Sequence, residues 1–224
     1  MDVNDYLTTD NTSVQLNDVC VYTTPELSPE SMILKHLTVT AHKSEIIGMV
    51  GRTGPGKTTL LSALQNISTN RTGQVLFDGK DLNDIPNVIL RQIIGVLPQL
   101  PFVFKGWTLR RFVDPRRLFT DEEINQALNK CALLKFVNEP PEEDLAEQTS
   151  ARSNDIGVQI YDSLHKYFDK CTTFVTAHDV NVLKTCTSVW VIHEGCLVRR
   201  CKTSDIAESD LIHSIIEESV YNTQ

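Results

Sequence analysis

The chain has 224 residues, 41% of them hydrophobic and 22% charged, which is the composition of a globular protein with one large domain or two small ones. Its net charge of -8 argues against a protein that chiefly binds nucleic acid, and no nucleic-acid partner is expected. No apolar run is long enough to span a bilayer, and the acidic start Met1–Asp5 is unlike a signal peptide, so any role at a membrane is expected from outside the lipid. The six cysteines are scattered without a C-x-x-C pair, which favours reduced thiols over a zinc knuckle or a disulfide framework.

The first part of the chain has the pattern of two strands. Apolar and polar residues alternate through Val14–Tyr22, which predicts an edge strand, and Pro25 and Pro29 then indicate a loop. A second strand is predicted at Ile33–Thr40.

A glycine-rich turn follows the apolar run Ile46–Val50 and precedes a helical pattern at Thr58–Leu64. The segment Gly51–Thr58 fits G-x-x-x-x-G-K-[ST], in which glycines let backbone N–H groups surround a polyphosphate. In this pattern the lysine, here Lys57, reaches the outer phosphates, and the threonine, here Thr58, ligates Mg²⁺ through its hydroxyl. A helix N-terminus adds its dipole to such an anion site. The sequence therefore predicts a phosphate-binding loop rather than a turn that merely joins a strand to a helix.

Four further elements are predicted downstream. A strand with an Asp-Gly turn is expected at Gly73–Leu82, a short helix at Val88–Gln92 and a buried strand at Ile93–Leu97. An amphipathic helix is expected at Asp121–Val137. Its apolar stripe comprises Ile124, Leu128, Cys131, Leu134 and Val137.

Several of these segments occur in a family order: Tyr22, the loop Gly51–Thr59, the hairpin Val75–Gly79, Leu97–Phe104 and Thr108–Pro115. In this order the chain resembles the nucleotide-binding domain of an ABC transporter, most closely of the multidrug-resistance-associated (C-type) branch. The resemblance implies an α/β P-loop NTPase fold of ABC type, with a mixed sheet, flanking helices and a truncated helical subdomain.

The same resemblance implies a division of the chain. Residues 1–13 are expected to form an N-terminal tail, 14–200 the ATP-binding domain, with the helical subdomain reduced to about 121–147, and 201–224 a C-terminal helical tail.

The resemblance also implies roles for single residues. Tyr22 would stack on adenine, although a half-buried strand tyrosine fits its sequence equally well. Gln99 would touch Mg²⁺ or the attacking water, and His178 would contact the γ-phosphate. The loop residues expected to contact nucleotide are Gly51, Arg52, Thr53, Gly54, Gly56, Lys57, Thr58 and Thr59.

After the amphipathic helix the chain departs from the family. It lacks both the Leu-Ser-x-Gly-Gln signature and the apolar strand that precedes the catalytic glutamate. The segment Glu147–Ser153 resembles the family segment that begins with this glutamate, which would make Glu147 the catalytic carboxylate and put Ala146 where a magnesium-ordering Asp belongs. Asp144 is a steric alternative for that Asp, and a solvated acidic linker is an alternative for the whole segment. We expect the missing strand to belong beside the strand of the phosphate loop, so either another segment fills its place or buried backbone groups lack partners and the core is destabilised.

The activity implied by the family is ATP hydrolysis coupled to transmembrane export, with ATP and Mg²⁺ as cofactors. The implied place is the cytoplasmic face of a membrane, through transporter membrane domains that this chain does not contain, and the implied partner is a complete ABC nucleotide-binding domain. Because the signature is missing, turnover by this chain is expected to be weak. The alternative is a non-catalytic, truncated or spliced module that pairs with an intact domain. A kinase or GTPase is disfavoured because the sequence has no Asn-Lys-x-Asp motif.

Overall fold

The computed structural model describes residues 13–51, 56–97, 104–131, 133, 166–176 and 180–203. The chain forms two compact units: the first comprises Met1–Gly95 and Lys170–Gln224, and the second comprises Val96–Asp169. In the described residues, no helix combines the length and the apolar character needed to cross a bilayer.

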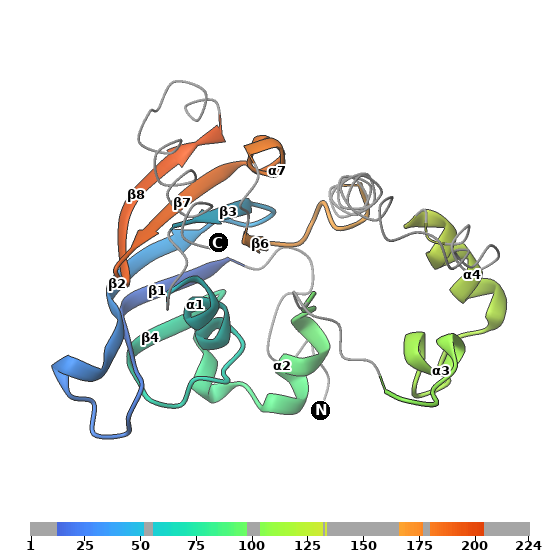
Figure 1. The fold of residues 1–224 in the computed structure, drawn as a ribbon, viewed down its shortest axis with the longest axis horizontal. Coiled ribbons are helices and arrows are strands. Elements are labelled where there is room, and N and C mark those ends of the chain that lie inside the picture. Colours follow the sequence, from blue (N-terminus) through green and yellow to red (C-terminus); the bar gives the residue numbers. More distant parts are fainter. Residues whose placement is uncertain are drawn as a thin grey trace, which may run out of the picture. The chain divides into compact units, whose positions relative to one another are not determined.

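The first unit contains an antiparallel sheet with the strand order β2-β1-β4-β5 (Figure 1). Its strands are β1 (Val14–Tyr22), β2 (Met32–Ala41), β4 (Arg71–Phe77) and β5 (Lys80–Asp81). The bounds of β1 match the predicted strand, but its expected place at an edge is wrong, because β1 lies between β2 and β4. The pairing with β4 joins segments far apart in the sequence, which the alternation of residues within β1 cannot reveal.

The second sheet of this unit has the strand order β6-β3-β7-β8. The central strand β3 (Ile46–Val50) is parallel to β6 (Thr173–Thr176) on one side and to β7 (Ser188–His193) on the other. The last strand, β8 (Cys196–Lys202), is antiparallel to β7 and runs two residues past the expected end of the ATP-binding domain at residue 200. In Figure 1, β3, β7 and β8 lie side by side, with α7 next to β7.

Both neighbours of β3 are therefore present. Of the two outcomes expected for the missing strand, the structure shows that other segments fill the place, since residues 173–176 and 188–191 pair with the two edges of β3. The backbone groups of β3 thus find partners without the missing family strand. Among the described residues, β6 pairs with β3 alone, so this sheet ends at β6.

A carboxylate holds the start of β3 against β7 and β8. The side chain of Glu45 is 10% exposed, and its Oε1 accepts hydrogen bonds from Ser188 at 2.6 Å and Arg200 at 2.9 Å. Its Oε2 accepts the backbone N–H of His42 at 2.7 Å. Burial alone would raise the pKa of Glu45, but the hydrogen bonds from Ser188, His42 and Arg200 outweigh burial and lower it.

The helices of the first unit are α1 (Lys57–Leu64), α2 (Asn87–Ile93) and α7 (Val180–Lys184), with the short 3-10 turns η2 (Pro29–Ser31) and η3 (Leu82–Asp84). Apolar residues of α1, α2, η3 and both sheets form one hydrophobic core. The most completely buried large side chains are Trp190, Leu16, Leu34, Leu37, Ile47, Met49, Leu60, Leu82, Ile89, Leu90 and Leu183.

The buried strand predicted at Ile93–Leu97 is absent from the described residues. Ile93 is the last residue of α2, and the backbone N–H of Ile94 donates to Leu90, which continues the helical pattern. The side chains of Val96 and Leu97 are 53% and 73% exposed. A short apolar run fits a strand or a helix end equally well, and only a paired neighbour makes it a strand.

In the second unit the described helices are α3 (Leu109–Val113) and α4 (Asp121–Lys130). Thr120 and Glu123 form a capping box at the start of α4, so this end agrees with the prediction. The helix is shorter than the predicted one and is capped by Cys131, while Leu134 and Val137 lie outside the described residues. Within the predicted stripe, Ile124 is buried and Leu128 and Cys131 are half-buried.

Candidate nucleotide-binding site

Gly51 follows the end of β3 and Gly56 precedes α1, and both glycines lie close to β7. A Cβ at Gly51 would overlap the backbone carbonyl oxygen of Ile192 on β7. A Cβ at Gly56, the residue before α1, would lie 3.3 Å from Cγ2 of Ile192. The strand β7 therefore forms a wall against both glycines of the predicted loop.

Lys57 is the first residue of α1, and its side chain is buried beside the start of the loop. It is 7% exposed, and its Nζ donates a hydrogen bond to the carbonyl oxygen of Gly51 at 2.6 Å. Burial lowers the pKa of Lys57 because it removes water from the ammonium group. A bound anion would offset part of this desolvation cost, so the position suits a phosphate.

The first turn of α1 supplies the other groups of the site. The N–H of Leu60 donates to Gly56 at 2.8 Å and begins the helical bonding, so the N–H groups before it point out of the helix end. Thr58 is exposed and Thr59 is half-buried. Thr58 thus offers a hydroxyl at a helix N-terminus, where an anion is favoured.

Tyr22 is the last residue of β1, opposite Met32 on β2. Its backbone N–H donates to Asn70 at 2.9 Å, and its side chain is half-buried. Half-burial fits both interpretations of this tyrosine, so adenine stacking stays a prediction.

The remaining candidates lie outside the described residues. They are Arg52, Thr53, Gly54, Gln99, Asp144, Ala146, Glu147 and His178. Of the predicted site, the structure brings together Gly51, Gly56, Lys57, Thr58 and Thr59.

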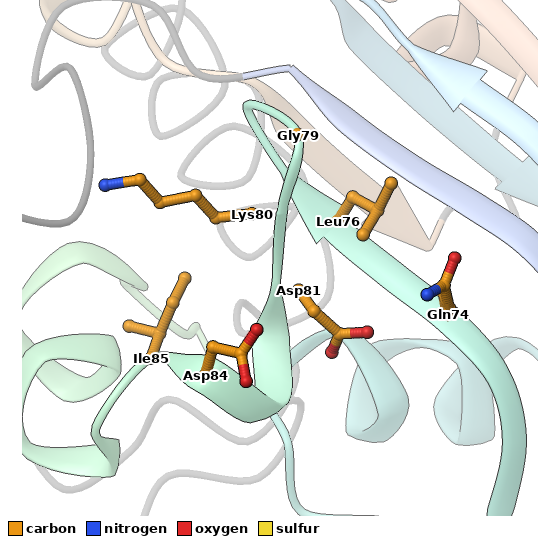
Figure 2. Close-up of a pocket in the computed structure, with 7 residues that line it drawn as sticks. All are labelled: Gln74, Leu76, Gly79, Lys80, Asp81, Asp84 and Ile85. Carbon is orange, nitrogen blue, oxygen red and sulfur yellow. The ribbon is translucent and has the colours of Figure 1, made fainter.

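A separate open hollow of about 600 Å³ lies over the β4–β5 turn. Figure 2 shows the side chain of Lys80 extending away from the carboxylates of Asp81 and Asp84. The carboxylate of Asp81 accepts the N–H of Asn83 at 2.9 Å. None of the predicted nucleotide-contacting residues lines this hollow, so we do not assign nucleotide to it.

Sequence reasoning missed Ile192, which contributes its backbone carbonyl and its side chain to the wall beside the loop. Its residue type carries no signal of that role, because any residue has the same carbonyl group. The register of β7 against β3, with Val50 opposite Val191, is what brings Ile192 next to Gly51.

A strand between two parallel neighbours, a glycine after it whose Cβ would overlap β7, and a helix that begins with a buried lysine are the features of a P-loop nucleotide-binding domain. The model of the ABC transporter family matches residues 34–153, more than half of the chain, and the chain therefore belongs to the ABC transporter family as an ATP-binding domain. The family and the α/β P-loop fold predicted from the sequence are thus confirmed.

Curated relatives come from the C family of these transporters. The chain is 31% identical to ABC transporter C family member 14 of Dictyostelium discoideum, over 74% of this chain and 15% of the relative. It is 28% identical to ATP-binding cassette sub-family C member 2 of Rattus norvegicus, over 83% of this chain and 14% of the relative. The chain thus spans about 15% of the length of the relatives it matches.

A solved structure shows the same fold. The chain matches a structure of a bacterial Atm1-family ABC exporter with ATP bound at a TM-score of 0.79 and 19% sequence identity. The match covers 97% of this chain and 43% of the exporter chain.

Proposed function

We propose that this domain binds Mg-ATP at the loop Gly51–Thr59, with Lys57 facing the outer phosphates and Thr58 ligating Mg²⁺. The observation that carries the proposal is the buried ammonium of Lys57, 2.6 Å from the Gly51 carbonyl at the N-terminus of α1. An anion bound here would be stabilised by the positive charge of Lys57, by the N–H groups at the start of α1 and by the helix dipole. Bound Mg²⁺ would supply charge neutralisation for the phosphates.

The roles of the other candidates are proposed from the family resemblance. Tyr22 stacks on adenine, Gln99 holds Mg²⁺ or the attacking water, His178 contacts the γ-phosphate and Glu147 is the catalytic carboxylate. For His178 the register of β6 gives support: Thr176 pairs opposite Met49, at the end of the sheet where the loop begins. In the sequence, His178 follows Thr176 by two residues.

For the whole protein we propose export driven by ATP hydrolysis, at the cytoplasmic face of a membrane. The names of the relatives and the Atm1-family exporter support this proposal. The membrane domains are then supplied outside this chain, which we propose to consist of a tail at 1–13, the ATP-binding domain from residue 14 to the end of β8 at Lys202, and a second tail after it. The alternative is a non-catalytic module that pairs with an intact nucleotide-binding domain, and the missing signature favours it.

The binding site is tested by comparing two lysine variants in a thermal-shift titration with Mg-ATP. Lys57→Ala removes the charged contact to the outer phosphates and is expected to cost about 1.5 to 3 kcal/mol of binding free energy. Lys80→Ala is the matched control, because Lys80 lines the separate hollow over β4–β5.

We expect ATP to stabilise the unchanged chain and Lys80→Ala equally, and Lys57→Ala far less. Equal stabilisation of Lys57→Ala and the unchanged chain would refute the proposed site. Loss of stabilisation in Lys80→Ala alone would place nucleotide in the hollow instead.

A further inference from the structure

Two β-bulges face each other across β1 and β2. In one, Asp18 is an extra residue opposite Thr38, and in the other, His36 is an extra residue opposite Cys20. Both extra residues have φ of 51°, and each donates its N–H to the side chain opposite. Asp18 donates to the Thr38 hydroxyl at 3.0 Å, and His36 donates to the Cys20 sulfur at 3.2 Å.

The two bulges bring a carboxylate, a thiol and an imidazole together. Nδ1 of His36 lies 2.7 Å from Oδ1 of Asp18. One ligand atom from each of Asp18, Cys20 and His36 lies within 4.8 Å of the other two. Cys20 is 2% exposed, whereas the side chains of Asp18 and His36 are 71% and 68% exposed. The group thus combines one fixed, buried ligand with two that solvent reaches.

We propose that Asp18, Cys20 and His36 bind a divalent transition-metal ion of the Zn²⁺ class. A thiolate, an imidazole and a carboxylate are the ligand types that Zn²⁺ takes in proteins, at about 2.0 to 2.3 Å. Ligand atoms on one tetrahedral ion lie roughly 3.3 to 3.7 Å apart, a separation that results from those bond lengths. The exposed side chains of Asp18 and His36 can make the adjustment of about 1 Å that this requires by rotating, while Cys20 stays in place.

Charge and proton balance support the same ion. Binding replaces the proton of the Cys20 thiol by the metal and releases that proton to solvent. The thiolate and the Asp18 carboxylate then carry two negative charges, which one divalent cation neutralises. Three protein ligands leave the fourth position of a tetrahedral ion to water, on the side where Asp18 and His36 are exposed.

The site is independent of the phosphate loop and has no familiar sequence spacing. Asp18 and Cys20 are two residues apart, and His36 comes from the next strand, so no zinc-knuckle pattern exists. The two bulges bring Asp18, Cys20 and His36 together, and the sequence pattern does not predict these bulges.

The test is a titration of the reduced, nucleotide-free full chain with Co²⁺, followed by absorption, and then with Zn²⁺. We expect one Co²⁺ per chain with a near-ultraviolet thiolate-to-cobalt band, which Zn²⁺ abolishes. His36→Ala and Asp18→Ala should each weaken Co²⁺ binding roughly tenfold or more. His42→Ala is the matched control, since His42 is an exposed histidine just after β2.

Cys20 is buried, so its replacement could prevent folding. The test therefore uses variants of the two exposed ligands, Asp18 and His36. A chain without the thiolate band, or one whose Co²⁺ affinity is unchanged in His36→Ala, would overturn the proposal. Equal weakening in His42→Ala would also overturn it, since the ion would then bind elsewhere.

Discussion

The carboxylate of Asp114 joins the end of α3 to the turn before α4. It is 3% exposed and accepts the backbone N–H groups of Leu118 at 3.0 Å and Phe119 at 2.9 Å. Arg110 donates to it at 3.0 Å and also pairs with Asp121 at 2.6 Å. Burial alone would raise the pKa of Asp114, but these hydrogen bonds and the Arg110 charge lower it to about 2.

Because of this lowered pKa, the stability of the second unit is expected to depend on pH in the acid range. Since the folded-state pKa of about 2 lies below the ordinary value of 3.8, ionised Asp114 stabilises the fold above about pH 4. That stability is lost as the pH falls from about 4 to 2. We expect the amide protection factors of Leu118 and Phe119, measured by hydrogen exchange, to hold at neutral pH and fall across this window.

In Asp114→Ala both amides should already lose protection at neutral pH, because their acceptor is gone. Asp121→Ala is the control. Asp121 is 77% exposed and pairs with Arg110, but the amides of Leu118 and Phe119 donate to Asp114 instead. Protection that survives in Asp114→Ala would show that other acceptors hold the turn.

Among the secondary-structure elements, α7 depends on a glycine in β3. A Cβ at Gly48 would lie 2.6 Å from Cδ2 of Leu183 and 3.1 Å from the sulfur of Cys186. Leu183 is fully buried and Cys186 is 4% exposed, so both side chains would have to shift within the core to make room for a Cβ. The absence of a side chain at residue 48 is what allows this contact.

Gly48→Ala is therefore expected to lower the free energy of unfolding by about 1 to 3 kcal/mol through overpacking. Alanine is otherwise better than glycine inside a strand by about 0.5 to 1 kcal/mol, so overpacking is the larger effect. Denaturant unfolding measures the difference. Gly95→Ala is the control, because a Cβ there meets nothing within 4 Å. A Gly48→Ala variant as stable as the unchanged chain would show that α7 adapts without cost.

Local patterns predicted most elements of the first unit. The strand β3 was predicted with its observed bounds, Ile46–Val50, and the helix α1 within one residue, because apolar periodicity and the glycine turn act locally. The central place of β1 and the two neighbours of β3 were not predicted, since both depend on pairing between distant segments.

The same distinction applies to the sites. The phosphate loop could be predicted because its pattern is contiguous in sequence. The role of Ile192 and the grouping of Asp18, Cys20 and His36 could not, since strand register and paired bulges create them. The prediction of a strand at Ile93–Leu97 was wrong for a related reason. Its apolar pattern fits a strand, but no strand pairs with this segment in the described residues.

At the scale of the whole molecule, the missing signature predicts how the chain associates. Intact domains of the family pair head to tail, each phosphate loop facing the signature of the other, so this chain can offer only half of that interface. With Mg-ATP it should form no homodimer and release phosphate slowly, but it should pair with a complete C-type domain. We expect nucleotide to drive this pairing, because in the proposed arrangement the γ-phosphate would contact both partners and so bind the paired state more tightly.

Light scattering and phosphate release, measured on the same samples with and without Mg-ATP, check this prediction. Turnover of the chain alone on the order of 1 per second, lost in Glu147→Gln, would show that Glu147 rebuilds the catalytic site. An ATP-driven homodimer would contradict the proposed half-interface, and no pairing in any mixture would leave a solitary nucleotide binder.

The long separation between β3 and its neighbours has a consequence for how the protein is made. The backbone N–H of Ile46 donates to the hydroxyl of Thr187, which is 141 residues later. At about 5 to 20 residues per second, β3 therefore leaves the ribosome roughly 7 to 30 seconds before β7 is made. During that interval β1, β2 and β4 can already pair, while β3 presents an apolar strand with both edges open until β6 is made and one edge open until β7 is made, the kind of surface that chaperones protect. Ile192 can lie against Gly51 only after β7 has been made and has paired with β3. Bound nucleotide can therefore assist only the last stage of folding.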